Sequence, residues 1–275
     1  MTYANYHSRR MPSALRYLAD LLRYRHLAWN LVGSDLRSRF RRSHLGILWA
    51  MLQPLGYSLV IAWAWGAIFK AEDYWSFALY VYSGMLIWDY FTNSVMASLD
   101  GLASAVGYLR QSRIPFFVFQ IRIPLSGMVV FYAAMCGLLI MMLALGRFPT
   151  PGLHLLLLPA YGAVLLAFML PVAILMSVVG TQFRDLKHIM TIALQALFFL
   201  SPVMMQRDYM NDGHLAILQY INPLVPLLDM LRDPVLHGQL WDRQDVIIVL
   251  SWSAGLWLLA TIASFRAGRK IVFAL

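Results

Sequence analysis

The stretch Asp35-Leu-Arg-Ser-Arg-Phe-Arg-Arg-Ser-His-Leu-Gly-Ile-Leu-Trp49 decides both the solvent and the orientation of this chain. It carries four arginines and runs directly into the first apolar stretch that is long enough to cross a bilayer. Arginine and lysine are enriched on the cytoplasmic flanks of membrane spans. The stretch therefore predicts an integral membrane protein whose N-terminal end is cytoplasmic.

The composition supports the same conclusion. Hydrophobic residues make up 60% of the 275 residues and charged residues 13%, whereas soluble proteins have about 45–50% and about 25%. The apolar excess must face lipid. The net charge of +9 is spread between apolar stretches rather than along one face, so we expect no nucleic-acid partner. The single cysteine, Cys136, excludes a disulfide within the chain.

Six apolar stretches approach the length of about 20 helical residues that a hydrocarbon core requires. Pro124 interrupts the third stretch and predicts a kink or an early break there. Pro159 and Pro171 in the fourth are tolerable, because neighbouring helices can satisfy the freed carbonyls. The six stretches cover residues 47–69, 77–99, 115–145, 153–180, 189–205 and 246–265.

The basic residues are distributed unequally between the two sides that these spans define. Sixteen flank the side that holds both chain ends, and five flank the other side. The positive-inside rule then places the N- and C-termini in the cytoplasm, in agreement with an even number of spans. The sequence predicts an all-α membrane protein with six transmembrane helices, divided into a basic interface segment, residues 1–46, and a membrane domain, residues 47–275.

Residues 12–32 place apolar side chains, the last of them Trp29, on one helical face and charged side chains on the other. This pattern predicts an amphipathic helix in the plane of the inner membrane interface. The arginines that follow either hold this end of the chain inside or bind an anionic headgroup. They are Arg37, Arg39, Arg41 and Arg42.

Two short cytoplasmic connections, residues 101–113 and 180–188, join spans two to three and four to five. The second combines alternating charges with an apolar residue in a tight turn, which suits docking to a cytoplasmic partner. A plain helical hairpin is equally compatible with this composition. The candidate docking residues are Arg110, Arg113, Phe183, Arg184, Asp185 and Lys187.

Two ionisable residues, Asp89 and Arg122, lie well inside predicted spans. A charge within the hydrocarbon core is costly unless it has a partner. Their depths on neighbouring antiparallel spans match, so we expect them to form a structural salt bridge.

Aromatic side chains recur at helical spacing on spans one and two. They either line a path along which sugar rings slide or belong to the aromatic belts found at membrane interfaces. The candidate lining residues are Tyr57, Trp65, Tyr80, Trp88 and Phe91.

The segment between spans five and six, residues 206–245, is too apolar for a solvated loop and contains Pro223, Pro226 and Pro234. Broken helical pieces that are too short to cross the membrane predict re-entrant or interfacial periplasmic helices, which would form an outer gate. The gate candidates are Asn222, Pro223, Asp229 and Arg232.

The sequence contains no phosphate-binding loop, no nucleophile elbow and no histidine at metal-ligand spacing. We therefore expect no catalytic residue, no metal and no cofactor in this chain. If the protein moves a substrate uphill, the energy must come from another subunit or from an ion gradient.

In their order along the chain, several motifs resemble the transmembrane subunit of polysaccharide ABC exporters (type-2 ABC permeases), especially the O-antigen exporter subgroup. They are the arginine-rich stretch quoted above, Gly84-Met-Leu-Ile-Trp88, Gly107-Tyr-Leu-Arg-Gln-Ser-Arg-Ile-Pro115, Phe183-Arg-Asp-Leu186, Phe198-Phe-Leu-Ser-Pro202, Asn222-Pro-Leu224, Leu228-Asp-Met-Leu-Arg232-Asp-Pro-Val-Leu-His-Gly238 and Arg269-Lys-Ile-Val-Phe273.

The resemblance implies a homodimer with two copies of a separate ATPase that binds ATP and Mg. It implies export of undecaprenyl-diphosphate-linked polysaccharide across the bacterial inner membrane, from cytoplasm to periplasm. The two connections would couple to the ATPase, the arginines of residues 37–42 would meet the lipid diphosphate, and the aromatic residues would line the glycan path. Export of capsule, teichoic acid or a small lipid is an alternative, as is a membrane-embedded glycan-processing enzyme or acyltransferase.

Overall fold

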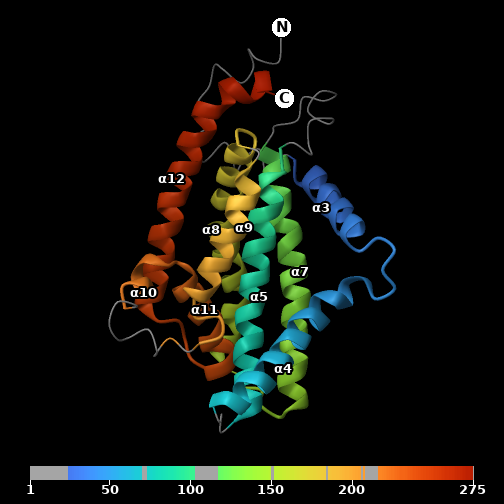
Figure 1. Ribbon diagram of the computed structural model, residues 1–275, viewed down its shortest axis with the longest axis vertical. Helices are drawn as coiled ribbons and strands as arrows, with labels where there is room; N and C mark the ends of the chain where they lie inside the picture. Colours follow the sequence, from blue (N-terminus) through green and yellow to red (C-terminus); the bar gives the residue numbers. More distant parts are fainter. Residues whose placement is uncertain are drawn as a thin grey trace.

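The computed structural model describes residues 24–69, 73–102, 117–149, 152–183, 185–205, 207 and 216–274. These ranges contain helices and no strand, as Figure 1 shows. The α-helices are α3 (Arg25–Arg39), α4 (Trp49–Phe69), α5 (Tyr74–Leu99), α7 (Phe117–Ala144), α8 (Leu157–Gly180), α9 (Leu186–Phe199), α10 (Leu218–Ile221), α11 (Leu224–Arg232) and α12 (Arg243–Ala274), with short 3-10 helices at Gly46–Leu48 and Leu153–Leu156 and a π-helical turn at Asp233–His237.

Helix α5 forms the centre of the bundle and packs against α4, α7, α8, α9 and α11. Tyr82 on this helix is fully buried, and its hydroxyl lies 3.1 Å from the carbonyls of Met51 on α4 and Ala134 on α7. A Cβ atom at Gly137 would lie 2.4 Å from the same hydroxyl, so only glycine leaves room for it. One polar side chain thus holds three helices together.

Within the described residues, four helical segments are long and apolar enough to cross a membrane: Gly46–Trp65, Val118–Ala144, Leu153–Gly180 and Arg243–Ser264. Of the six predicted spans, these correspond to the first, third, fourth and sixth. Helix α5 has the length, at 26 residues, but its many tyrosines and Asp89 make it less apolar. Other helices bury most of its surface, so it needs less contact with lipid. Helix α9 has 14 residues and is a shorter apolar helix.

The structure has no break at Pro124, and the predicted end of the fifth span is wrong. Helix α7 continues without a break through Pro124, whose carbonyl accepts a 3.2 Å hydrogen bond from the hydroxyl of Tyr90. Helix α9 ends at Phe199, six residues before the predicted end, because Pro202 disfavours helical geometry in the residue that precedes it.

Helix α3 and the C-terminal end of α12 lie toward the same end of the bundle in Figure 1, and α10 and α11 lie toward the other end. At that other end Asp73 caps α5: its carboxylate accepts from the backbone N–H of Ser76 and pairs with Arg147, which follows α7. This ion pair joins the turns that precede α5 and follow α7.

The Asp73 pair makes stability at this end depend on pH. Hydrogen bonds from Arg147 and Ser76 hold the pKa of Asp73 well below its ordinary value. A lowered pKa means that the contribution is present above the ordinary aspartate pKa of about 4 and is lost as the pH falls below it. We expect the melting temperature to drop more between about pH 6 and about pH 3 in the wild type than in Asp73→Asn. Equal drops would contradict this prediction.

Candidate functional site

The segment after α9 folds back into the bundle as a hairpin, defined here as residues 216–238 and called the outer hairpin. Asn222, in extended geometry, starts α11 by accepting a 3.0 Å hydrogen bond from the backbone N–H of Leu224. Pro223 follows at the helix start, where its missing N–H is no loss. Gly238 ends the hairpin with a left-handed φ of 65°. Eight of the nine residues of α11 are buried, so this short helix is part of the core.

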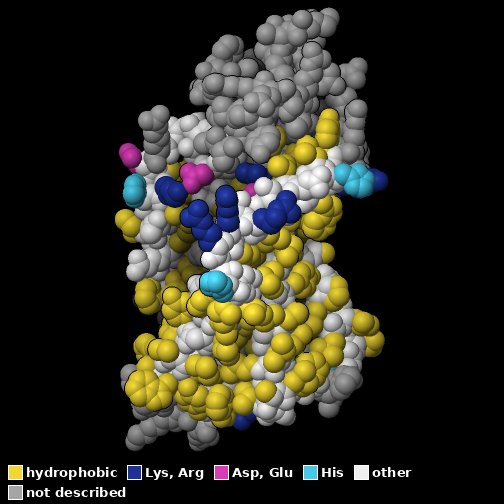
Figure 2. All heavy atoms as spheres, turned by 90° about the vertical axis from the view of Figure 1, so that its right-hand side faces the viewer, with side chains coloured by type: hydrophobic (Ala, Val, Ile, Leu, Met, Phe, Trp, Pro, Cys, Tyr) yellow, Lys and Arg dark blue, Asp and Glu magenta, His cyan; other side chains and the backbone are white. Residues whose placement is uncertain are grey.

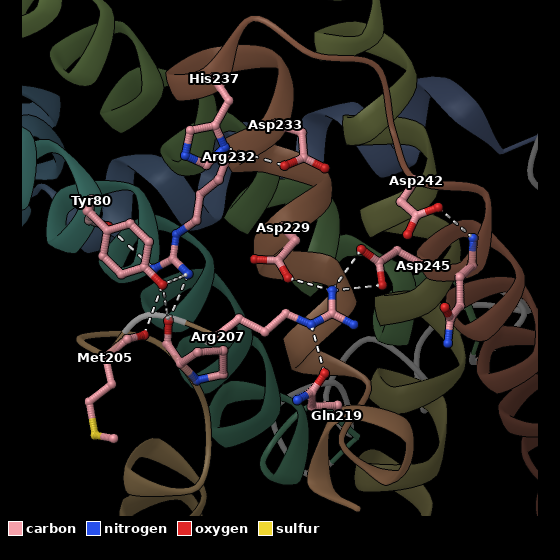
Figure 3. Close-up of polar contacts among 12 residues, drawn as sticks. Tyr80, Met205, Arg207, Gln219, Asp229, Arg232, Asp233, His237, Asp242 and Asp245 are labelled. Carbon is pink, nitrogen blue, oxygen red and sulfur yellow. Dashed lines mark hydrogen bonds and ion pairs between the residues drawn. The ribbon is translucent and has the colours of Figure 1, made fainter. Parts of the chain in front are cut away.

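Arg232, at the end of α11, is a buried arginine with 1% of its surface exposed. Its guanidinium donates 2.8 Å and 3.0 Å hydrogen bonds to the carbonyls of Pro202 and Val203, and it lies 3.6 Å above the ring of Tyr80 (Figure 3). It also donates to the hydroxyls of Tyr80 (2.8 Å) and Ser83 (3.3 Å) on α5. The side chain joins α11 to α5 and to the turn that follows α9.

These bonds satisfy backbone carbonyls in the turn that follows α9. An unsatisfied carbonyl away from water costs several kcal/mol. Arg232 meets the carbonyls of residues 202 and 203, and the amide of Asn222 donates to the carbonyl of Leu200 (3.1 Å) and to the hydroxyl of Ser201 (2.8 Å). The outer hairpin therefore stabilises the turn in which the chain leaves α9 inside the protein.

Gly84 on α5 makes this approach possible. A Cβ atom there would lie 2.5 Å from the carbonyl oxygen of Val203 and 2.8 Å from a guanidinium nitrogen of Arg232. Tyr80, which the sequence suggested as a lining residue, is part of this cluster, and its hydroxyl donates a 2.8 Å bond to the carbonyl of Met205.

A second arginine, Arg207, organises the charged part of the hairpin (Figure 3). It pairs with Asp229 at 2.8 Å and with Asp245 at 3.1 Å, and its Nε donates to the side chain of Gln219 at 3.1 Å. These contacts join α10, α11 and α12. No periodicity in the sequence connects Arg207 to partners that lie 22 and 38 positions away.

Burial and neighbouring charges shift the pKa values of the charged groups in and beside the outer hairpin. Burial raises the pKa of Asp229, and Arg232 and Arg207 oppose that shift. Burial lowers the pKa of Arg232. For Arg207 burial also acts to lower the pKa, but the carboxylates of Asp245 and Asp229 outweigh it and raise the pKa overall. In the part of the chain that the structure describes, no group of three or more histidine, cysteine or acidic residues could hold a metal ion.

At the opposite end of the bundle, the residue after α5 is joined to the second predicted connection. Lys187, in the first turn of α9, pairs with Asp100 after α5 at 2.6 Å. A Cβ atom at Gly180 would lie 2.4 Å from the carbonyl oxygen of Leu99, so α8 and α5 touch backbone to backbone. Phe183 is 62% exposed beside this contact, and Asp185 begins α9. Three further candidates, Arg110, Arg113 and Arg184, lie outside the described residues.

The four arginines of the predicted entrance are all exposed on one side of the protein. Arg37 and Arg39 lie in the last turn of α3, and Arg41 and Arg42 follow it; Arg42 has a positive φ of 66°. Figure 2 shows basic side chains as a band across this face, with apolar surface below. Of the predicted amphipathic helix, residues 12–23 lie outside the described part. The described helix α3 buries Ala28, Leu31 and Val32 and leaves Trp29 exposed.

The predicted lining residues do not form one group. Trp88 and Phe91 on α5 lie 6.3 Å apart between ring centroids, and Trp88 contacts Phe198 of α9 edge-on at 5.1 Å. Tyr57 and Trp65 project from α4, with 51% and 40% of their surfaces exposed. No pattern in the sequence connects Phe198 to this aromatic group, because only folding brings α9 against α5.

The predicted salt bridge between Asp89 and Arg122 is wrong. Arg122 pairs with Asp35 of α3 at 3.3 Å, and Asp89 interacts electrostatically with Arg39. Matching depth on neighbouring spans could not identify the true partner of Arg122. That partner lies on α3, which packs along α7 and supplies a carboxylate from a distant part of the sequence.

The long apolar helices define a multi-pass membrane protein. A family model described as ABC-2 type transporter matches residues 26–236, and the chain belongs to this family. The chain is a transport subunit, and ATP hydrolysis belongs to a separate partner.

Several curated proteins are similar to the chain over most of its length. It is 26% identical to the O-antigen export system permease protein RfbA of Myxococcus xanthus, over 87% of this chain and 94% of that protein. It is 24% identical to the protein of the same name from Klebsiella pneumoniae, over 84% and 86%. The polysialic acid transport protein KpsM of Escherichia coli is 23% identical, over 74% and 79%.

Proposed function

We propose that this chain is the membrane subunit of an ATP-driven exporter that moves an undecaprenyl-diphosphate-linked polysaccharide of the O-antigen type from the cytoplasm to the periplasm. It would work in the bacterial inner membrane as a homodimer with two ATPase subunits. Helices α4, α5, α7, α8, α9 and α12 would be its six spans, with both chain ends in the cytoplasm. The observation that carries the proposal is the similarity to O-antigen permeases over 84–87% of the chain.

The two ends of the bundle suit the two halves of this task. The end with the Lys187–Asp100 pair offers an exposed aromatic side chain between joined turns, as a docking element for an ATPase requires. The outer hairpin, with Asn222, Pro223, Asp229 and Arg232, closes the opposite end and would act as the outer gate. Trp88, Phe91, Tyr57 and Trp65 would contribute apolar surfaces to the glycan path.

Deletion of the gene tests the proposal directly. We expect cells without it to lose surface polysaccharide and to accumulate the lipid-linked glycan inside, as measured by surface labelling and by mass spectrometry of extracted lipids. Restoring the gene together with its ATPase should reverse both changes. Unchanged surface polysaccharide in the deletion strain would contradict the proposal. Loss of capsule alone would favour the second candidate, capsule export, which the similarity to KpsM supports.

Phe183 tests the docking role separately from folding. Because its ring is 62% exposed, Phe183→Ala should change the melting temperature little. Loss of a central apolar anchor at a subunit contact, in contrast, typically costs about 2 kcal/mol or more of binding free energy. We expect copurification of the ATPase and polysaccharide export to fall about tenfold or more. Phe199→Ala is the matched control, because Phe199 is 73% exposed at the other end of α9. Equal behaviour of the two variants would remove the docking role.

A further inference from the structure

The outer hairpin is tied to three different parts of its own subunit by buried side chains. Arg232 bonds to α5 and to the turn that follows α9, as described above. From another side, the hydroxyl of Tyr161 on α8 donates a 3.0 Å hydrogen bond to the carbonyl of Leu227 on α11, and both residues are fully buried. On the third side, the ion pairs of Arg207 connect α11 to the start of α12 (Figure 3). The helix α11 is thus held by α5, α8 and α12 at the same time.

The apolar face of α11 belongs to the main core of the protein. It lies in one cluster with buried side chains of α5, α7 and α8. The side chains of α11 in this cluster are each at most 2% exposed, and they are Leu224, Leu227, Leu228, Met230 and Leu231. Segments that move in proteins typically have few buried apolar contacts and an exposed backbone. A swing of the hairpin away from the bundle would take all of these side chains out of the core.

The two ends of the hairpin, where a lid would need hinges, are also held by hydrogen bonds. Asn222, which precedes α11, donates from its amide group to Leu200 and Ser201, and its side-chain oxygen accepts from the backbone of α11. At the other end, the indole of Trp241, which precedes α12, donates a 2.7 Å hydrogen bond to the carbonyl of Met230. The segment that leaves the hairpin is therefore tied back to α11 itself.

We propose that the outer hairpin is a rigid part of its subunit, and that the outer end opens by movement of whole subunits and not by a swing of the hairpin. Helix α11 then moves together with α5, α8 and α12 in every step of transport. This mode of opening rests on the function proposed above, because it requires a homodimeric exporter whose outer end opens. The gate is in that case the boundary between two rigid subunits.

Hydrogen exchange of the wild-type protein, assembled with its ATPase in nanodiscs, tests the proposal without any substitution. We expect the backbone amides of residues 224–232 to exchange as slowly as those of the central helix α5. Addition of ATP and Mg should change their exchange rates less than about twofold. A hairpin that swings open would expose these amides to water, and their exchange with ATP present would rise about tenfold or more. Such a rise overturns the proposal.

A covalent link between α11 and α12 gives an independent test by function. The carboxylates of Asp229 and Asp245 contact the same guanidinium nitrogen of Arg207, so the two side chains lie close together. Asp229→Cys and Asp245→Cys place two thiols there, which a short bifunctional reagent can join through reducible disulfides. Arg207→Gln removes the cation that would otherwise lose both partners. Cys136, the single native cysteine, is first replaced by serine.

Polysaccharide export by this variant is compared before and after a reducing agent opens the link. A rigid hairpin predicts export that is equal in the two states within about twofold. Export that is blocked in the linked state and rises about tenfold or more on reduction shows a swinging hairpin and overturns the proposal. Asp242→Cys with Gln244→Cys is the matched control for the reagent. Both residues are exposed at the start of α12, and a link between them cannot restrain the hairpin.

The two measurements also separate this proposal from the function on which it rests. If the cysteine variant does not fold, hydrogen exchange of the wild type still shows whether α11 opens. Failure of the proposed function is seen elsewhere, as unchanged surface polysaccharide in the deletion strain, and it leaves the exchange rates of α11 unaffected.

Discussion

Arg232→Ala is expected to be among the most damaging single substitutions in this protein, with a loss of about 2–6 kcal/mol of stability. The substitution removes the donor of the Val203 carbonyl and leaves the Pro202 carbonyl only the 3.4 Å bond from the Tyr80 hydroxyl, and an unsatisfied buried group costs about 1–3 kcal/mol. The empty volume beside Tyr80 adds to this loss. At roughly 2–4 °C per kcal/mol for a chain of this size, the melting temperature in detergent should fall by about 5 °C or more.

Two further variants identify the cause of this effect. Arg232→Lys keeps the charge but loses the planar fork that reaches two carbonyls, so it should recover only part of the stability. Arg243→Ala, at an exposed position at the start of α12, should leave the melting temperature nearly unchanged. If Arg232→Ala and Arg243→Ala melt at the same temperature, the hairpin does not depend on the buried arginine. Export should be lost in Arg232→Ala if the outer hairpin is the gate.

Gly180→Val is expected to force apart the ends of α5 and α8, from which the two predicted connections start. The new Cβ atom would lie 2.4 Å from the carbonyl oxygen of Leu99 and 2.9 Å from its Cα, and both are backbone atoms that cannot rotate away. Overpacking of this kind costs about 1–3 kcal/mol. Export should fall further than stability does, because the substitution displaces the contact beside the Lys187–Asp100 pair.

Gly255→Val is the matched control for this substitution. Gly255 lies within α12, and a Cβ atom there would meet nothing within 4 Å. Valine is a slightly better helix former than glycine, so the control should be neutral or weakly stabilising. Both melting temperature and export distinguish the two variants. If Gly180→Val is as active and as stable as Gly255→Val, the close contact between α5 and α8 is not needed for coupling.

Most of the helices could be predicted because hydrocarbon-length apolar runs and their charged flanks are local properties of the chain. Four predicted spans reappear as helical segments that meet the length and hydropathy of a membrane crossing. The apolar, proline-broken stretch around Pro223 also indicated short helices where α10 and α11 lie. The end of α9 was predicted less well, because the turn that follows it depends on Arg232 and Asn222, which donate to its carbonyls from a distant part of the sequence.

The sequence by itself determined that this chain is a helical membrane protein with an apolar hairpin before its last helix. Composition and periodicity decide which segments can be buried in lipid. Only the tertiary structure decided which charges meet: Arg122 with Asp35 instead of Asp89, and Arg207 with Asp229 and Asp245. The physical reason is distance along the chain. Hydropathy acts residue by residue, whereas an ion pair depends on how helices that are remote in sequence pack side by side.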